Sequence, residues 1–332
     1  MKLRGIYTIR DTVQPYYWDI VFEWEDIFSK ALNLPLIRVG SRYDNIYKPS
    51  TLRKVLNRLN IYQRFEALFR SSDAYLAFHI GPPGVYSFYT SPNVIPIIID
   101  FWKHEPLGRL RSIFSNSSVV FVTSKEVCNF LAENSISLPI EHLAVSLPDS
   151  CLYPVSNTMR RHDIVQFGRQ NSLLTAFVKR LLEERPEIDY VFAEKVGDKQ
   201  IIRSTKYGDL GEARSRTEFM NILRQSKVCL VSTPGIDGDT DRTGGFSPVT
   251  PRFLEAAGAG CQLVGTYADN ADSNYFDLEQ ICKRVSDYDS FKSEVLEGVS
   301  RMTPVDHHSY LANHLTSARA SELIAKLSIH GI

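Results

Sequence analysis

Short apolar runs alternate along the chain with longer segments in which apolar residues recur at helical spacing. In the first half, runs short enough for buried strands lie at residues 3–9, 36–39, 74–79, 94–99, 118–123 and 142–146. Helical spacing occurs at residues 18–32 and 52–69, and again after Ser124, a good N-cap, as far as Glu133. Strands that alternate with helices on this scale predict a parallel sheet.

The same alternation restarts after residues 147–161, a polar segment with two prolines and no periodicity. Strands are predicted at 164–167, 190–193, 227–232 and 261–266, and helices at 173–184, 216–225 and 306–327. The pattern therefore predicts an α/β protein with two Rossmann-like, doubly wound domains that face a central cleft. We place the first domain at 1–155 and the second at 156–305, with a C-terminal helix in 306–332 that crosses back to the first.

The composition, 43% hydrophobic and 23% charged over 332 residues, is ordinary for a globular protein. Lysine plus arginine (38) equals aspartate plus glutamate (38), so the charge gives no reason to expect a nucleic-acid partner. The N-terminus lacks the apolar core of a signal peptide, and the five cysteines form no C-x-x-C pair. We expect a cytoplasmic protein with reduced thiols.

The helix predicted at 52–70 carries a basic stripe, formed by Arg53, Lys54, Arg58 and Arg64. Such a stripe is either a solvated face or a surface for an anionic membrane or a lipid-linked diphosphate. The second interpretation predicts peripheral contact with the inner face of the membrane.

The segment from Thr250 to Gly260 has the strongest local signal for a ligand site. Thr250 is a good N-cap and Pro251 fits the first helical position, after a Gly- and Asp-rich loop that follows a strand. In an open α/β sheet such a loop lies where ligands bind, and backbone N–H groups at a helix start favour an anion. Arg252 and Glu255 lie three residues apart and therefore on nearly the same face of the helix. There the arginine suits a phosphate, and the glutamate suits a ribose hydroxyl. The alternative is a surface salt bridge between them.

Two neighbouring segments suggest the same ligand. Gly168 and Arg169 follow a strand, where glycine lets a ligand approach the backbone and a guanidinium can hold a diphosphate bidentately, although such a pair is often only a turn. The loop 234–248 is interpreted either as a solvated loop or as a cover for a sugar, with Gly244, Gly245 and Phe246 against it. Its aspartates at 237, 239 and 241 have the spacing of the first three ligands of an EF-hand calcium loop. An EF-hand loop would next need glycine at 242 and glutamate at 248, but these residues are Arg242 and Pro248, so no metal is predicted.

In the first half, polar residues follow two successive strands. His79 ends one strand before a Gly-Pro turn, and Asp100, Trp102 and His104 follow the next. Polar groups that converge beside an aromatic side chain suit sugar binding. The alternatives are a structural histidine and an N-cap aspartate. His307, His308 and His314 lack zinc-site spacing and are expected on the surface of the final helix.

Three segments resemble glycosyltransferases of the GT-B fold, particularly the retaining family 4 type and its group 1 relatives. They are Asp163–Arg169, Phe219–Ser232 and Arg252–Gly260, and residues 119–147 resemble the last helix-strand unit of that family's acceptor domain. The resemblance implies that His79 faces a donor sugar. Two positions depart from the family pattern: Ser247 stands where a first glutamate is usual, and Gln170-Asn-Ser-Leu173 lacks the usual lysine.

The resemblance implies transfer of a sugar from a nucleotide sugar to a hydroxyl of a glycan or lipid-linked glycan, in cell-surface polysaccharide synthesis. It implies retention of configuration, no metal, and no cofactor beyond the donor itself. The residues expected to act are His79 and Asp100 in catalysis, Trp102 and His104 on the acceptor, and Gly168, Arg169, Gly245, Phe246, Thr250, Arg252 and Glu255 on the donor. The alternatives are a nucleotide-sugar epimerase or hydrolase on the same fold, and a non-catalytic nucleotide-sugar-binding protein.

Overall fold

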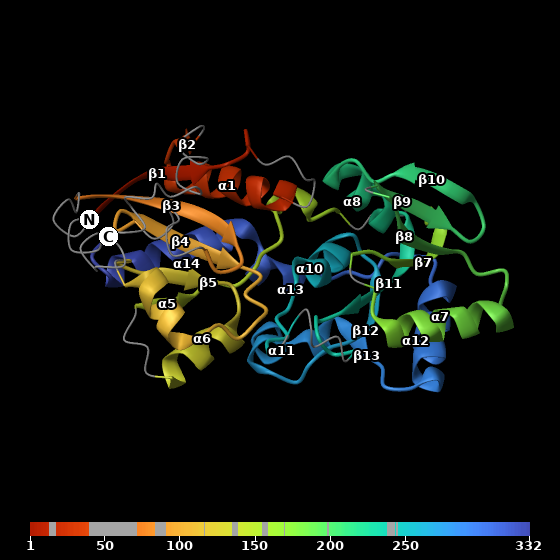
Figure 1. The fold of residues 1–332 in the computed structure, drawn as a ribbon. Helices are drawn as coiled ribbons and strands as arrows, with labels where there is room; N and C mark the ends of the chain where they lie inside the picture. The colour runs from red at the N-terminus through yellow and green to blue at the C-terminus, as the bar shows by residue number, and fades with distance from the viewer. Residues whose placement is uncertain are drawn as a thin grey trace. The chain divides into compact units, whose positions relative to one another are not determined.

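In a computed structural model, the chain forms two compact units (Figure 1). It describes residues 1–12, 18–39, 72–83, 91–115, 117–134, 139–154, 159–168, 170–197, 199–237, 243 and 245–332. Unit 1 is Met1–Val145 with Thr316–Ile332, and unit 2 is Ser146–Leu315. Sequence patterns predict boundaries after residues 155 and 305, ten residues inside each end of unit 2. The two ends of unit 2 are paired, since the Leu147 N–H donates to the carbonyl of His314 (2.8 Å), and this pairing is not visible in the local sequence.

Unit 1 contains a six-stranded sheet in the order β2-β1-β3-β4-β5-β6, with every neighbouring pair parallel. Its strands are β1 (Lys2–Thr8), β2 (Leu36–Arg38), β3 (Asp73–Ile80), β4 (Val94–Ile99), β5 (Val120–Val122) and β6 (Ile140–His142). All six residues of β4 are buried, as expected for a strand covered on both faces. The predicted strand at 142–146 overlaps β6 only at His142, because the chain leaves the sheet there.

Among the described residues of unit 1, the helices that cover this sheet are α1 (Asp19–Leu32), α5 (Leu107–Phe114), α6 (Lys125–Glu133) and α14 (Thr316–Ile329). In Figure 1, α1 lies on one side of the sheet and α5 and α6 on the other. Helix α1 buries Val21, Trp24, Glu25 and Phe28, a stripe at helical spacing. Ser124 caps α6 as predicted, since its side chain accepts from the Val127 N–H.

Unit 2 contains seven strands in the order β10-β9-β8-β7-β11-β12-β13. They are β7 (His162–Gln166), β8 (Tyr190–Val196), β9 (Lys199–Ser204), β10 (Gly208–Glu212), β11 (Ser226–Ser232), β12 (Gln262–Thr266) and β13 (Cys282–Arg284). Strands β7, β8, β11, β12 and β13 are parallel, whereas β8, β9 and β10 form an antiparallel meander. Strands β9, β10 and β13 are not predicted from the sequence, because they are short and mostly polar.

Helices cover both faces of the sheet of unit 2. Helices α7 (Ser172–Glu184) and α12 (Tyr288–Ser300) bury Leu174, Val178, Phe291 and Val295 in one core with the central strands. The remaining helices are α8 (Arg216–Arg224), α10 (Pro251–Gly258), α11 (Ala271–Phe276) and α13 (His308–Leu311), with short 3-10 turns at Asp149–Cys151, Leu278–Gln280 and Ala312–His314. The predicted start of α10 is confirmed, with Thr250 at the N-cap and Pro251 first.

The single helix predicted at 306–327 is wrong. Its first part forms α13 and a 3-10 turn, Leu315 is extended, and α14 begins at Thr316. His307 and His314 precede α14 and are buried, each 8% exposed, so their expected surface position is also wrong. Aromatic packing against Phe276 and Tyr310 encloses His314.

Some predicted features lie outside the described residues. They include the helix at 52–70 and its proposed membrane contact, as well as Arg169 and Gly244. Of the helices that the structure describes, none combines the length and apolar character needed to cross a bilayer.

Gly265 on β12 tests the close pairing of β11 and β12. A Cβ at this position would overlap the carbonyl oxygen of its register partner Val231, so backbone would have to move. We expect Gly265→Ala to lower the free energy of unfolding of unit 2 by roughly 3 kcal/mol, measured by urea denaturation.

Gly108 on α5 is the matched control, because a Cβ there meets nothing within 4 Å. Gly108→Ala should stabilise by about 0.5–1 kcal/mol through helix propensity. Equal effects of the two substitutions would contradict the packing of β12.

Candidate functional site

The strand order identifies one edge of each sheet as the place for a ligand. In unit 1, β2 lies on one side of β1 and β3 on the other; in unit 2, β8 and β11 flank β7 in the same way. Consecutive connections therefore leave in opposite directions, which opens a crevice outside the carboxyl ends of these strands. The groups just after β1, β3, β7 and β11 are accordingly the first candidates for binding and chemistry.

After β1, a buried carboxylate organises the start of the loop. Thr8 ends the strand, and its hydroxyl donates to Oε2 of Glu25 on α1 (2.5 Å). Arg10 contacts the same Oε2 (3.1 Å) and also Asp26 (2.9 Å). The guanidinium is thus locked between helix and strand, and it holds residues 8–10 in one conformation.

Burial raises the pKa of Glu25 to about 7, although the hydrogen bonds from Thr8 and Arg10 favour its ionised form. The side chain is 2% exposed, so this carboxyl cannot contact a ligand directly. Sequence reasoning missed Glu25. The available signal was an acidic residue inside the apolar stripe of the helix at 18–32.

Near the end of β3, His79 is held in one tautomer. Its Nδ1 lies 2.6 Å from the carbonyl oxygen of Gly81, which can only accept, so Nδ1 carries the proton. Burial lowers the pKa of His79, and the ring is neutral near pH 7 with the lone pair on Nε2. The local turn makes this geometry possible, because Gly81 has a φ of 74°. His79 can therefore accept a hydrogen bond or a proton through Nε2.

Asp100 follows β4 directly and has a φ of 54°, a left-handed conformation that is uncommon outside glycine. Burial raises the pKa of its carboxyl to about 6, slightly offset by the indole N–H of Trp102, which lies nearby without hydrogen-bond geometry. The strand register places Asp100 beside Gly81, because His79 pairs with Ile98 and the two strands then end together. Asp100, whose backbone is strained, and a neutral histidine therefore lie at the same edge of the sheet of unit 1.

The two residues predicted to bind the acceptor lie a few positions further along. Trp102 is half-buried, and the ring of His104 packs edge-on against Phe130 (4.6 Å between centroids). The edge formed by His79, Asp100, Trp102 and His104 thus combines polar groups with an aromatic surface, a combination suited to sugars.

In unit 2 an arginine lies against the turn after β7. Gly168 has a φ of 73°, and a Cβ at Gly168 would lie 3.5 Å from Nη2 of Arg252. The guanidinium of Arg252 also stacks on Phe219 of α8 (3.9 Å from its carbon to the ring centroid). The structure thus brings together Gly168 and Arg252, two of the residues predicted to bind the donor.

Glu255 lies one turn along α10 from Arg252 and is 3% exposed. Its Oε2 lies 2.9 Å from Nη1 of Arg252, and its Oε1 accepts from Nη1 of Arg216 on α8. The salt bridge between Arg252 and Glu255, which the sequence left as the alternative to ligand contacts, is therefore present, but Glu255 is buried and not on the surface. Arg216 was not predicted, because an arginine at a helix start has no distinctive sequence signal.

Hydrogen bonds hold the last part of the loop before α10, around Ser247. The hydroxyl of Ser247 lies within hydrogen-bond distance of Thr233 Oγ1 (2.9 Å) and of the Pro234 carbonyl (2.6 Å), and Asn270 donates to the Ser247 carbonyl (2.9 Å). Ser247, where the family has a glutamate, thus closes the loop onto the end of β11. In the same part of the loop, Phe246 is buried and Gly245 is exposed. Thr250 occupies the N-cap of α10 without a side-chain cap hydrogen bond.

In the part of the chain that the structure describes, no cluster of three or more His, Cys, Asp or Glu side chains is arranged to hold a metal ion. Asp237 instead accepts from the Ser172 N–H at the start of α7 (3.3 Å), while the aspartates at 239 and 241 lie outside the described residues.

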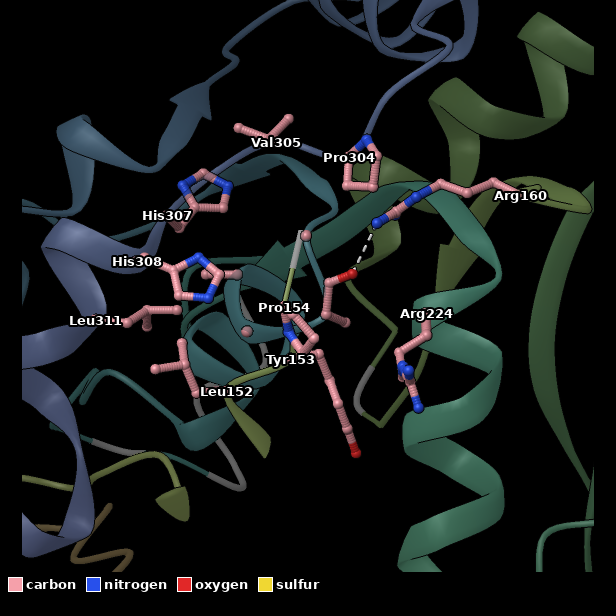
Figure 2. Close-up of a pocket in the computed structure, with 14 residues that line it drawn as sticks. Leu152, Tyr153, Pro154, Arg160, Arg224, Pro304, Val305, His307, His308 and Leu311 are labelled. Atoms are coloured by element: carbon pink, nitrogen blue, oxygen red, sulfur yellow. Dashed lines mark hydrogen bonds between the residues drawn. The ribbon is translucent and has the colours of Figure 1, made fainter. Parts of the chain in front are cut away.

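Figure 2 shows a small pocket at the opposite, amino-terminal edge of the sheet of unit 2, with a cavity volume of about 20 Å³. Arg160 donates to the carbonyl of Ala259 at the end of α10 (2.8 Å), and Nε2 of His307 lies 3.1 Å from the Cys261 carbonyl. Arg224 stacks on Tyr153 (3.8 Å). Arg160 and His307 therefore cap main-chain carbonyls, and we assign the pocket a structural role.

The buried carboxyl of Glu25 predicts a pH-dependent stability. Its folded-state pKa of about 7 lies above the ordinary 4.5, so its contribution to stability is fully present below pH 4.5 and is lost as the pH rises through about 7. Between pH 5 and pH 8 the wild type should lose about 2.5 kcal/mol of the unfolding free energy of unit 1 through this titration, and Glu25→Gln should abolish that loss.

Denaturant unfolding at four pH values in this range measures the difference. Asp26→Asn is the control, since it removes the exposed carboxylate from Arg10 and keeps the buried one. Parallel pH profiles for the wild type and Glu25→Gln would show that Glu25 does not titrate as inferred.

Comparison with known proteins yields likeness in structure only. No family model matches the chain, and no curated protein matches its sequence. A putative UDP-N-acetylglucosamine 2-epimerase from Listeria monocytogenes aligns over 99% of this chain and 96% of its own, with 14% identity and a TM-score of 0.50.

Two glycosyltransferase structures are also similar. The pneumococcal O-GlcNAc transferase GtfA, in complex with UDP and GlcNAc, aligns over 81% of this chain with 12% identity and a TM-score of 0.46. TarM of S. aureus aligns over 78% with 11% identity and a TM-score of 0.47. This chain spans 60% of the length of GtfA and 55% of TarM.

At these identities the likeness concerns the fold, and the predicted fold class is confirmed. The chain has an α/β fold of the GT-B type, with two Rossmann-like units built on parallel-dominated sheets.

Proposed function

We propose that the protein is a glycosyltransferase that moves a sugar from a nucleotide sugar to a hydroxyl of a glycan or lipid-linked glycan. The observation that carries the proposal is the position of Arg252, which is stacked on Phe219 and lies against Gly168 at the ligand edge of unit 2. A guanidinium held in this way is suited to a diphosphate.

The donor is assigned to unit 2. Its diphosphate meets Arg252 beside the turn at Gly168, where a ligand can approach the backbone. As the bond between the anomeric carbon and the diphosphate breaks, negative charge develops on the leaving group, and Arg252 stabilises it electrostatically. Arg169, Thr250 and Glu255 are the further donor contacts predicted from the sequence.

The acceptor is assigned to unit 1. Its hydroxyl oxygen forms the new bond to the anomeric carbon, and its proton passes to the carboxylate of Asp100. With a pKa of about 6, Asp100 is mostly ionised near pH 7, yet it remains basic enough to accept a proton. Nε2 of His79 accepts a hydrogen bond from a sugar hydroxyl. Retention of configuration, which the family resemblance implies, requires the hydroxyl to attack from the same face that the diphosphate leaves. Independence from a metal ion stays a prediction of the same resemblance.

The second candidate is a nucleotide-sugar epimerase or hydrolase. The same edge of unit 1 supports it, because a neutral histidine and a carboxyl with a raised pKa also suit proton transfer at a sugar carbon. The two functions differ in their need for an acceptor. An epimerase or hydrolase consumes the nucleotide sugar alone, whereas a transferase requires an acceptor for rapid turnover.

Nucleotide binding is the first expected outcome. At a ligand concentration of about 100 Kd, binding stabilises a protein by about 2.7 kcal/mol. For a protein of this size that corresponds to a rise in Tm of roughly 5–10 °C. A thermal-shift panel of ADP, CDP, GDP, TDP and UDP, with their common nucleotide sugars, measures it. A flat response across the panel would overturn the proposal.

Asp100→Asn separates chemistry from donor binding. Asparagine tolerates a left-handed φ, so the backbone is preserved, but it cannot take up the proton. We expect kcat to fall about 100-fold or more with an unchanged donor Kd, since a positioned base contributes about 10²–10⁴. The wild-type rate should also rise with pH through about 6, and the variant should lose this dependence.

Asp277→Asn is the matched control, because Asp277 also has a left-handed φ (46°) but caps the end of α11. It should leave kcat and the pH profile unchanged. If Asp100→Asn retains the wild-type rate and profile, Asp100 is not the base.

A further inference from the structure

The carboxylate of Glu255 is shared between two arginines from different helices. Nη1 of Arg216, on the first residue of α8, donates to Oε1, and Nη1 of Arg252 lies 2.9 Å from Oε2. Nη2 of Arg216 also lies 3.5 Å from the sulfur of Cys151. Each oxygen of Glu255 is therefore engaged by a different guanidinium.

Exposure divides this triad into a buried part and an accessible part. The side chains of Glu255 and Arg216 are 4% and 8% exposed, whereas that of Arg252 is 26% exposed. A buried ion pair adds little net stability, but it fixes geometry because any displacement leaves a charge without its partner. Only Arg252 reaches the surface, and it does so with one edge anchored through Glu255.

Three contacts together define the orientation of Arg252. Glu255 engages Nη1, Phe219 lies under the face of the guanidinium at 3.9 Å, and Gly168 borders Nη2. Phe219 and Arg216 both belong to α8, so one helix supplies the aromatic platform and the anchor of the carboxylate. The N-cap Ser215, whose side chain accepts from the Glu218 N–H, fixes the start of this helix.

We propose that Arg216 is a positioning residue: through Glu255 it holds Arg252 in the orientation that binds the diphosphate of a nucleoside diphosphate. The inference rests on the proposed function for its ligand. It also gives Glu255 a role in orienting Arg252, in place of the contact with ribose hydroxyls expected from the sequence. The two roles differ in which part of the nucleotide loses affinity when Glu255 is changed.

Binding measurements on three ligands test the assignment. The nucleoside diphosphate that wild-type protein binds best among ADP, CDP, GDP, TDP and UDP is compared with its nucleoside, and for a ribonucleotide also with its 2′-deoxy form. Calorimetry measures the affinity for the diphosphates, and ligand-observed NMR measures the affinity for the nucleoside. The variants are Arg252→Met, Arg216→Lys and the double variant Arg216→Met with Glu255→Met.

The double variant removes both members of the buried pair. The charge that loses its partner, on Arg252, is 26% exposed and can be solvated, so the variant is expected to fold. Arg216→Lys keeps the charge but loses the planar fork, and it serves as a second, milder variant. Arg203→Met is the matched control, because Arg203 is also paired with two carboxylates in unit 2, Glu194 and Asp209, on the exposed meander.

We expect Arg252→Met and the double variant each to weaken diphosphate binding about tenfold or more, as for loss of a charge-assisted contact. Affinity for the nucleoside should stay within about twofold, and the preference between ribose and 2′-deoxyribose should not change. Arg216→Lys should fall between these variants and the wild type, and Arg203→Met should match the wild type.

Three results would overturn the assignment. An equal loss of nucleoside and diphosphate affinity in the double variant indicates a merely structural pair. A lost preference for ribose in that variant assigns Glu255 to the sugar. Wild-type affinity for the diphosphate in both Arg216 variants rejects the positioning role while leaving the proposed function intact. If the wild type binds no nucleoside diphosphate, the proposed function fails, and this assignment fails with it.

Discussion

In each unit the chain extends the sheet first to one side of its opening strand and then to the other. The parallel direction of the strands places all their carboxyl ends at one edge, and the reversal beside β1 and β7 separates the connections there. Such a reversal opens a crevice outside the carboxyl ends of the strands, where side chains and ligands can reach main-chain groups. The candidate residues of both units depend on this constraint. His79, Asp100 and Gly168 lie at or just after strand ends, and the start of α10 brings Arg252 beside Gly168.

Burial then determines what the charged groups at these edges can do. Glu25 and Asp100 are both carboxyls with raised pKa values, but Glu25 is enclosed by Thr8 and Arg10 whereas Asp100 ends a strand in a strained conformation. The first supports the loop after β1, and the second is the base in the reaction that we propose. In unit 2 a similar division separates the enclosed Glu255 from the accessible Arg252. In both units an enclosed acid positions an arginine.

Much of the fold was predictable because its signals are local. The run at 94–99 is apolar throughout and the run at 227–232 is apolar from Val228 to Val231, and they form the fully or largely buried strands β4 and β11. The start of α10 followed from Thr250 and Pro251, whose effects extend over one turn of helix. The meander of β9 and β10 was missed, because its polar, glycine-containing strands are stabilised by pairing with β8 and not by their own composition.

By itself the sequence determined the alternation of strands and helices and the chemical types of residue that follow each strand, because these depend on spacing along the chain. It also indicated the edge of each sheet at which we propose that ligands bind. Only the tertiary structure decided which of those residues meet. Arg216 and Glu255 are 39 positions apart, and Arg10 reaches Glu25 from another element. The protonation of Glu25 and Asp100 was also decided there, since a pKa depends on desolvation by residues that are distant in sequence. Such contacts leave no periodic pattern, and they follow only from the packing of whole elements.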